Sequence, residues 1–237
     1  MEFDTPLLEG RLLRRYKRFL ADIRLPDGSV VTAHTPNTGS MLGCAEPGSR
    51  VWLRDSGNPG RKYPLSWEIV EAGGATLVGI NTGLSNSLVR EAVEQGVAGE
   101  LAGYGAIRSE VRYGNERSRI DLLLQGHATA ADCFLEVKNV TLAESGRALF
   151  PDAVSARGTK HLRELMSVVE SGLRAALCFC VQRGDVQVME PADRIDPEYG
   201  RTLRLARARG VELFAYRAAV SITGIRLDAA IPVRLPD

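Results

Sequence analysis

Lysine is scarce in this chain. Of its thirty basic residues only four are lysine, and they are Lys17, Lys62, Lys138 and Lys160. A lysine ammonium is a compact point charge, whereas an arginine guanidinium is a planar fork. A chain that uses arginine almost everywhere else is expected to keep lysine where a compact cation is needed. Chance placement is the alternative.

Other absences exclude whole classes of protein. The four cysteines form no C-x-x-C pair, so a metal or redox motif is not indicated, and buried, reduced thiols in a cytoplasm are expected. No apolar run is long enough to cross a bilayer, and no basic region precedes an apolar core near Met1, which argues against a membrane partner or a signal peptide. A net charge of +1 gives no global attraction to nucleic acid. The absence of a P-loop or glycine-rich dinucleotide motif disfavours an enzyme for small phosphorylated molecules.

Residues 1–82 are predicted to form a small β-barrel, with an OB-like fold the leading candidate. Apolar residues recur at period two between Phe19 and Leu25, and Pro26–Ser29 has the composition of a turn. Further strands are expected at Val30–His34, Val51–Leu53 and Ser66–Val70.

The barrel sequence contains a basic cluster with aromatic residues between the charges. Its members are Arg11, Arg14, Arg15, Lys17, Arg18 and Arg24, interleaved with Tyr16 and Phe19. Basic side chains and aromatic platforms on a barrel surface are typical of nucleic-acid binding. A solvated strand edge protected from aggregation by its charges is the alternative.

Residues 83–237 are predicted to form an α/β domain with a mixed sheet. A helix is expected from Ser85 or Asn86 to about Gln95, followed by three strands between Ser109 and Asn139. The expected elements that follow are a helix at 155–170, a strand at 173–182, a helix at 197–209 and a strand at 211–216.

The three strands between Ser109 and Asn139 carry the chemistry. If the hairpin turn lies between Asn115 and Glu116, facing positions sum to 231, so Glu110 faces Asp121. In the third strand Glu136 and Lys138 share one face, because side chains alternate along a strand.

The pattern Asp121, Glu136-x-Lys138 is suited to phosphodiester cleavage. Two carboxylates can hold Mg²⁺ and leave it open to water and phosphate, and Lys138 can orient or help deprotonate the attacking water. Glu110, Asp121 and Glu136 are therefore predicted metal ligands. The alternative is a set of ordinary ion pairs, Glu136 with Lys138 and Asp121 with Arg119, although unpaired acids are costly in a sheet buried on both faces.

Two further groups of basic residues are candidates for binding nucleic acid. Arg157, Lys160 and His161 lie in the first two turns of the helix at 155–170, where an anion is favoured. Arg201, Arg204 and Arg207 recur at spacings of three on the helix at 197–209, and would read a major groove if the protein were a DNA-binding regulator. A solvated helix face is the alternative for this second group.

With these residues assembled, the chain resembles the sugar fermentation stimulation protein A family of bacteria and archaea. The resemblance rests on Ser118–Asp121, Glu136–Leu142, Phe150–Val154, Arg157-Gly158 and Lys160–Leu162, and in the first half on His34–Met41, Arg61-Lys62, Trp67-Glu68 and Asn81-Thr82. It implies an OB-type domain, a second domain similar to PD-(D/E)xK nucleases, DNA binding, and a regulatory role in sugar (maltose) metabolism. Asp121, Glu136 and Lys138 match the nuclease motif.

The sequence therefore predicts a cytoplasmic DNA-binding protein that is a Mg²⁺- or Mn²⁺-dependent nuclease, with RNA as a further candidate substrate. A non-catalytic transcriptional regulator on a nuclease-like scaffold is the alternative. The oligomeric state stays open, a homodimer included. The residues predicted to contact nucleic acid are Arg14, Arg15, Lys17, Arg18, Arg61, Lys62, Arg157, Lys160 and His161.

Overall fold

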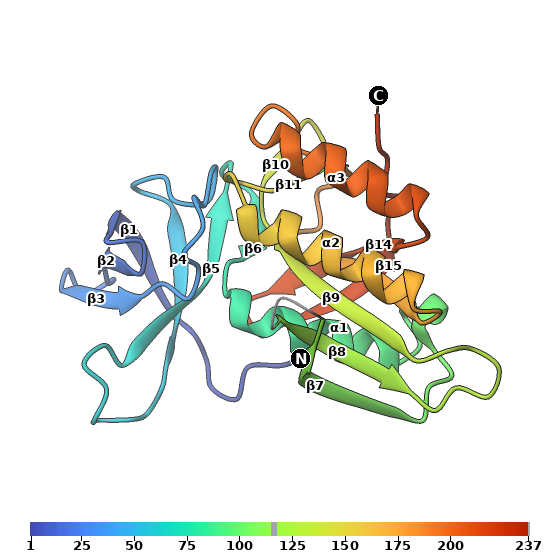
Figure 1. Cartoon of the computed structure of the whole chain (residues 1–237). Coiled ribbons are helices and arrows are strands. Elements are labelled where there is room, and N and C mark those ends of the chain that lie inside the picture. The colour runs from blue at the N-terminus through green and yellow to red at the C-terminus, as the bar shows by residue number, and fades with distance from the viewer. Residues whose placement is uncertain (115–117, 237) are drawn as a thin grey trace.

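The computed structural model describes residues 1–114 and 118–236 of the chain, which form a β-barrel and a larger α/β unit (Figure 1). The centre of the predicted hairpin turn, Asn115 and Glu116, lies outside the described residues. No helix in the two described ranges combines the length and the apolar character needed to cross a membrane.

The first unit is a six-stranded sheet that closes on itself. Its strands are β1 (Leu8–Tyr16), β2 (Leu20–Arg24), β3 (Val30–His34), β4 (Arg50–Asp55), β5 (Leu65–Ala72) and β6 (Thr76–Gly79). Their order is β3-β2-β1-β4-β5-β6, and a pairing of His34 with Ser66 joins β3 to β5, so β1 to β5 form the closed barrel. The OB-like barrel predicted from period-two alternation is confirmed.

The barrel is filled by the inward-facing residue of each alternating pair. Ile23, Leu53 and Trp67 are fully buried in one cluster. β1 passes so close to β2 that a Cβ on Gly10 would lie 2.4 Å from Cγ2 of Ile23. Only glycine fits this close approach of two backbones.

The second unit contains a six-stranded mixed sheet with helices on both faces. Its elements are η1 (Thr82–Leu84), α1 (Ser85–Glu94), η2 (Gly99–Leu101), β7 (Ala106–Tyr113), β8 (Ser118–Gln125), β9 (Cys133–Val140), β10 (Ala143–Glu144), β11 (Arg147–Phe150), α2 (Ala156–Glu170), β12 (Arg174–Val181), β13 (Val188–Pro191), α3 (Pro197–Ala208), β14 (Glu212–Ser221) and β15 (Gly224–Ala230). The order is β15-β14-β12-β9-β8-β7, with parallel pairing only between β9, β12 and β14. This is the mixed-sheet α/β domain that the sequence predicts.

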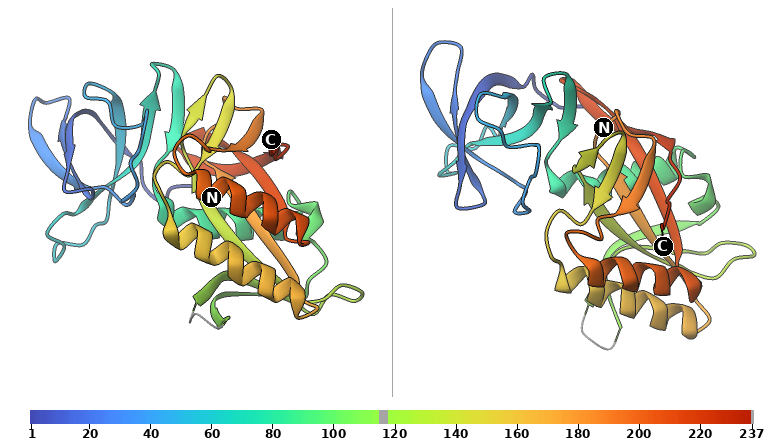
Figure 2. Two further views of the ribbon diagram at one scale, coloured as in Figure 1. Left: turned by 45° about the horizontal axis from the view of Figure 1, so that its top comes forward. Right: turned by 90° about the horizontal axis from the view of Figure 1, so that it is seen from above.

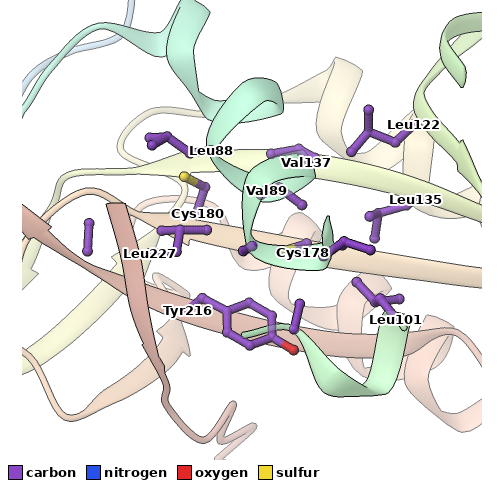
Figure 3. Packing of buried hydrophobic residues seen from close by; sticks show 14 of the residues in the cluster. Leu88, Val89, Leu101, Leu122, Leu135, Val137, Cys178, Cys180, Tyr216 and Leu227 are labelled. Carbon is purple, nitrogen blue, oxygen red and sulfur yellow. The ribbon is translucent and has the colours of Figure 1, made fainter. Parts of the chain in front are cut away.

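Helix α1 covers one face of this sheet, and α2 and α3 lie together on the other (Figure 2). Alternation in the central strand β12 explains both contacts: Ala176, Cys178 and Cys180 pack toward α1, while Ala175, Leu177 and Phe179 pack toward α2 and α3. Leu88 and Val89 of α1 meet these residues in the core shown in Figure 3.

All four cysteines are buried and free, as the sequence predicts. Burial raises the pKa of the Cys44 thiol to about 11 and those of Cys133 and Cys180 to about 12. These thiols are therefore inert at neutral pH, because only the thiolate reacts.

The structure contains strands that the sequence analysis did not predict. They are β1, β6, the small sheet β10-β11-β13, and β15. β10 is only two residues long, which leaves no periodic pattern to detect. In β15 the signal was present, because Ile225 and Leu227 are buried while Arg226 and Asp228 between and beyond them are exposed.

The first three residues belong with the second unit rather than with the barrel. The Met1 amine donates to the Glu91 carboxylate at 2.8 Å, and Glu2 pairs with Gly224 at the start of β15. The predicted range of 1–82 for the barrel thus includes a segment that packs on the α/β unit.

Candidate functional site

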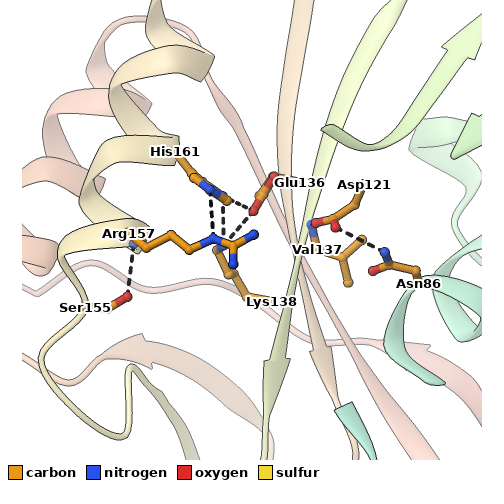
Figure 4. Close-up of polar contacts among 9 residues, drawn as sticks. Asn86, Asp121, Glu136, Val137, Lys138, Ser155, Arg157 and His161 are labelled. Atoms are coloured by element: carbon orange, nitrogen blue, oxygen red, sulfur yellow. Dashed lines mark hydrogen bonds and ion pairs between the residues drawn. The ribbon is translucent and has the colours of Figure 1, made fainter. Parts of the chain in front are cut away.

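Asp121 lies where strands β8 and β9 separate. The ladder between them runs from Leu124 paired with Cys133 to Leu122 paired with Leu135. Beyond this point the backbone N–H of Val137 donates to Asp121 Oδ2 at 2.7 Å, and Asn86 of α1 donates to Oδ1 at 3.0 Å (Figure 4). Both oxygens of this carboxylate are therefore fixed by the fold.

The surroundings of Asp121 disfavour its negative charge. Burial raises the pKa of this carboxyl above its ordinary value, and the nearby charge of Glu136 raises it further. The hydrogen bonds from Val137 and Asn86 and the charge of Lys138 oppose these effects without cancelling them. A cation bound beside Asp121 and Glu136 would relieve this repulsion.

The Glu136 side chain lies on the face of β9 that is turned toward α2, where it contacts His161. It is 2% exposed. Lys138 Nζ donates to Glu136 Oε1 at 2.6 Å, and His161 Nδ1 also contacts Oε1. The sequence prediction that Glu136 and Lys138 share a face is confirmed.

His161 contacts three charged side chains of the site. Arg157 Nε donates to His161 Nε2 at 3.3 Å. His161 Nδ1 faces Glu136 Oε1, and Lys138 Nζ lies 3.3 Å from the same nitrogen. The imidazole therefore helps to orient the Glu136 carboxylate.

The two oxygens of the Glu136 carboxylate have different environments. Oε2 is buried and has no hydrogen-bond partner among the described residues. Burial alone would raise the pKa of Glu136, but the hydrogen bond from His161 and the charge of Lys138 lower it below its ordinary value. The carboxylate is therefore charged at neutral pH with one oxygen unpaired, which is costly unless a cation binds there.

Glu110 does not join Asp121 and Glu136, which form the acidic pair, although the predicted register of the hairpin β7–β8 is correct. Val111 pairs with Ile120 and Ser109 with Leu122, so the positions sum to 231 on both sides. Glu110 itself has a left-handed backbone (φ 56°) and is exposed, and the ladder between β7 and β8 passes over the pair Glu110 and Asp121. The role of Glu110 as a metal ligand stays a prediction.

The irregularity extends to the opposite strand. Ile120 packs in the core under α2, whereas Leu122 packs in the core under α1, so the alternation of β8 is broken at Asp121. In a regular strand both residues would lie on one face. At this break Asp121 lies against Asn86 of α1.

The three basic residues predicted at the start of α2 have different environments. Arg157 is exposed and Lys160 is half-buried, and Ser155 caps the helix by accepting from the Gly158 N–H at 3.0 Å. His161 is only 5% exposed and contacts Glu136. In this arrangement His161 supports the acidic pair and lies away from the surface.

The basic cluster of the barrel is partly bound by the protein itself. Arg14 pairs with Asp22 at 2.8 Å, and Arg18 donates to the Thr38 carbonyl. Arg15 donates to the carbonyls of Asn37, Gly39, Ser40 and Arg18, and so holds the loop at 37–40. Of the predicted nucleic-acid set on the barrel, Lys17, Arg61 and Lys62 are exposed and their side chains have no hydrogen bond or ion pair within the described part of the chain.

We expect Arg15→Met to loosen the loop at 37–40. Each hydrogen bond from a charged donor contributes about 1.5–3 kcal/mol, and the variant removes several at once. Hydrogen exchange or limited proteolysis of the loop should increase clearly. Arg14→Met is the matched control, because the Arg14 side chain is 70% exposed and its ion pair lies at the surface. Equal protection in the two variants would contradict this role.

Several residues near the acidic pair were missed by the sequence analysis. Asn86 was considered only as a helix cap, yet it contacts Asp121. Glu164 of α2 is buried, one turn beyond His161, and Tyr113 has a buried hydroxyl whose pKa is raised by burial and then by the charge of Glu136. Only the spacing of His161 and Glu164, three residues apart in a helix, could have indicated a shared face.

The arginine stripe on α3 is engaged in ion pairs. Arg201 pairs with Glu198 and Arg204 with Asp193, each at 2.6 Å. These contacts favour the interpretation of the stripe as a solvated helix face.

Comparisons with known proteins agree with this architecture. The family model described as the SfsA N-terminal OB domain matches residues 13–80, and that described as the sugar fermentation stimulation protein RE domain matches residues 83–224. Sugar fermentation stimulation protein homologs from Geobacter metallireducens and Pelobacter propionicus are 60% and 63% identical to the chain, covering 99% and 97% of it and 100% and 98% of their own lengths. A structure of Pyrococcus furiosus SfsA in complex with Ca²⁺ is similar at a TM-score of 0.88 with 28% identity, covering 99% of this chain and 98% of that one. The chain belongs to the sugar fermentation stimulation protein family.

Proposed function

We propose that the protein is a nuclease that hydrolyses phosphodiester bonds in DNA or RNA with the help of Mg²⁺ or Mn²⁺. The observation that carries the proposal is the unpaired, buried Oε2 of Glu136, close enough to Asp121 for the two charges to repel each other. A protein that only binds nucleic acid has no need for two buried acids that repel phosphate.

The residues present fit a divalent cation. Asp121 and Glu136 offer carboxylate oxygens, which Mg²⁺ and Mn²⁺ prefer, and Mg²⁺ needs few protein ligands because it keeps several waters. The similar SfsA of Pyrococcus furiosus was determined in complex with Ca²⁺, which supports a divalent cation site in this chain as well. When bound, the ion would polarise the scissile phosphate and lower the pKa of a water molecule.

The chain's own residues have distinct parts in this reaction. Lys138 places an ammonium beside Glu136, where it can orient the attacking water and stabilise charge that develops on phosphate. His161 contacts Glu136 through Nδ1, and Asn86 and the Val137 N–H fix Asp121. Arg157, exposed at the start of α2, is available for the phosphate backbone.

The barrel would hold the nucleic acid. Lys17, Arg61 and Lys62 are exposed on it, and Lys62 Nζ lies 5.6 Å from the centre of the Tyr63 ring. A partly exposed aromatic ring beside an ammonium can stack with a base while the charge binds a phosphate.

A non-catalytic regulator remains the second candidate. It is favoured by the ion pair of Lys138 with Glu136, which could be a purely structural contact. It is disfavoured by the arginines of α3, because Arg201 and Arg204 are paired with acidic residues.

One experiment separates the two functions. Purified protein is incubated with labelled single- and double-stranded DNA and RNA in Mg²⁺, in Mn²⁺ and in EDTA. Cleavage that requires the metal supports the nuclease and identifies its substrate in the same gel. Binding without cleavage under every metal would favour the regulator.

Neutralising Lys17, Arg61 and Lys62 together should flatten the salt dependence of binding. Each lost phosphate contact reduces the slope of log K against log salt by about 0.7–0.9, so three contacts give a change of about two units or more. The measurement is a salt titration of DNA affinity. Arg201→Gln with Arg207→Gln is the control pair on α3. An unchanged slope in the triple variant would remove the barrel from the interface.

A further inference from the structure

A cavity of about 230 Å³ lies at the junction of the two units. One wall comes from the barrel loop at Asn37–Gly39, and the other from the end of β9 and from Phe150 and Asp152. The walls are held together by Asp152, whose Oδ2 accepts from Ser40 Oγ at 2.9 Å and from the Met41 N–H at 3.1 Å.

The cavity is next to the acidic pair. Asn139 lines it and follows Lys138 in β9. Ser85 donates to Asn139 Oδ1, and the next residue of α1, Asn86, donates to Asp121. The first turn of α1 thus contacts both the cavity wall and the Asp121 carboxylate, which links the cavity to the proposed metal site.

The lining is unsuited to phosphate. It contains no lysine or arginine, and its one charged group is the Asp152 carboxylate. The other polar side chains are the amides of Asn37 and Asn139 and the hydroxyls of Thr38, Thr82 and Thr141, and the apolar surface includes Leu142 and Phe150. Because Asn139 Oδ1 already accepts from Ser85 and Gln182, this amide offers its N–H groups.

The size also restricts the occupant. Pockets for drug-sized ligands have volumes of about 300–1,000 Å³, so this smaller cavity suits one planar ring system. A flat heterocycle with donors and acceptors on its edge matches neutral polar walls with apolar surface between them. Nucleobases are read in this way when they are unstacked from their neighbours.

We propose that this cavity is a nucleobase pocket that takes one unstacked base carrying an exocyclic amino group, with Asp152 as the acceptor for that group. The inference rests on the proposed function, and it restricts the substrate to a smaller class of nucleic acids. It favours single-stranded or locally unpaired nucleic acid, because taking a base out of a duplex costs a few kcal/mol. Cytosine offers an amino group at the position where uracil offers a carbonyl, which the carboxylate repels.

The test compares binding of short oligo(dC), oligo(dU) and an abasic strand of equal length in EDTA, where no cleavage occurs. Uniform sequences present the same base in every register. We expect oligo(dC) to bind about tenfold more tightly than oligo(dU), since a good base contact is worth about 1–3 kcal/mol, and the abasic strand to bind most weakly.

Asp152→Asn tests the assigned atom. An asparagine can still accept from Ser40 and Met41 but presents N–H₂ in place of the second oxygen, so the preference for oligo(dC) should vanish or reverse. Ser40→Ala is the matched control, because it removes one contact of the same carboxylate and should keep the preference. Thr38→Leu, at an exposed position, narrows the pocket and should reduce the base-dependent part of binding without requiring a change in the core.

The outcomes separate the pocket from the proposed function. Equal affinity of the wild type for all three strands, or an unchanged preference in Asp152→Asn, would overturn the pocket while leaving the nuclease proposal intact. No binding to any strand, together with no cleavage in Mg²⁺ or Mn²⁺, would overturn both.

Discussion

Asp121→Asn is expected to reduce metal-dependent cleavage by about a hundredfold to a thousandfold, while DNA affinity in EDTA stays the same or rises. A metal ion acting as a Lewis acid contributes several kcal/mol to the transition state, and each 1.36 kcal/mol is tenfold in rate. The amide keeps the shape of the site, because Asn86 can turn its side-chain amide and accept from the new N–H₂ group. The Val137 N–H still has an oxygen to bind.

The comparison needs a control with the same chemical change elsewhere. Asp132→Asn is suitable, because Asp132 precedes the other end of β9 and accepts from Gln125 Nε2 at 2.8 Å. Its cleavage rate should match the wild type. Lys138→Met should lose cleavage with affinity little changed, since the Lys138 side chain is only 13% exposed. Parallel loss of binding and cleavage in Asp121→Asn would contradict a role in the chemical step.

Local sequence patterns were sufficient to predict the strands and the helix that hold this site. The hairpin register was correct because a short turn between two apolar strands restricts which residues face each other, and Val111 does pair with Ile120. The shared face of Glu136 and Lys138 followed from strand alternation alone. Helix α2 was located by its apolar spacing, and Ser155 is its cap.

The parts that were not predicted depend on contacts between distant segments. Glu110 was expected beside Asp121, but Glu110 has a left-handed backbone, the ladder passes over this pair, and the alternation of β8 is broken at Asp121. Arg15 resembled a nucleic-acid contact, yet four carbonyl groups surround its guanidinium. No local pattern marks an arginine that binds its own chain, since three of the four acceptors come from a loop more than twenty residues away.

Binding of Mg²⁺ or Mn²⁺ should be measurable without any substrate. A ligand at a hundred times its Kd stabilises the folded state by about 2.7 kcal/mol, and a chain of this length gains about 2–4 °C in Tm per kcal/mol. The wild-type Tm should therefore rise by about 5–10 °C, and that of Asp121→Asn by much less. Asp132→Asn should respond like the wild type.

The pH dependence of stability without metal should follow the raised pKa of Asp121. The proton that this carboxyl binds in the folded state stabilises the protein fully below the unfolded pKa of about 4. That contribution is lost as the pH rises through the higher folded-state pKa. Asp121→Asn should therefore be more stable than the wild type at neutral pH, and the difference in stability should shrink toward pH 4. The contribution of Glu136 to the pH dependence is present in both proteins, so it largely cancels in the comparison.

Together the two measurements locate the cation. If Asp121 and Glu136 hold it, the variant that is more stable without metal becomes less stable than the wild type in saturating metal, so the order of the two Tm values reverses. If Glu136 and Lys138 form only a structural ion pair, the order of the two Tm values should not reverse, because a divalent ion then does not stabilise the folded state. Equal shifts in both proteins would place the ion elsewhere, and would remove Asp121 from its ligands.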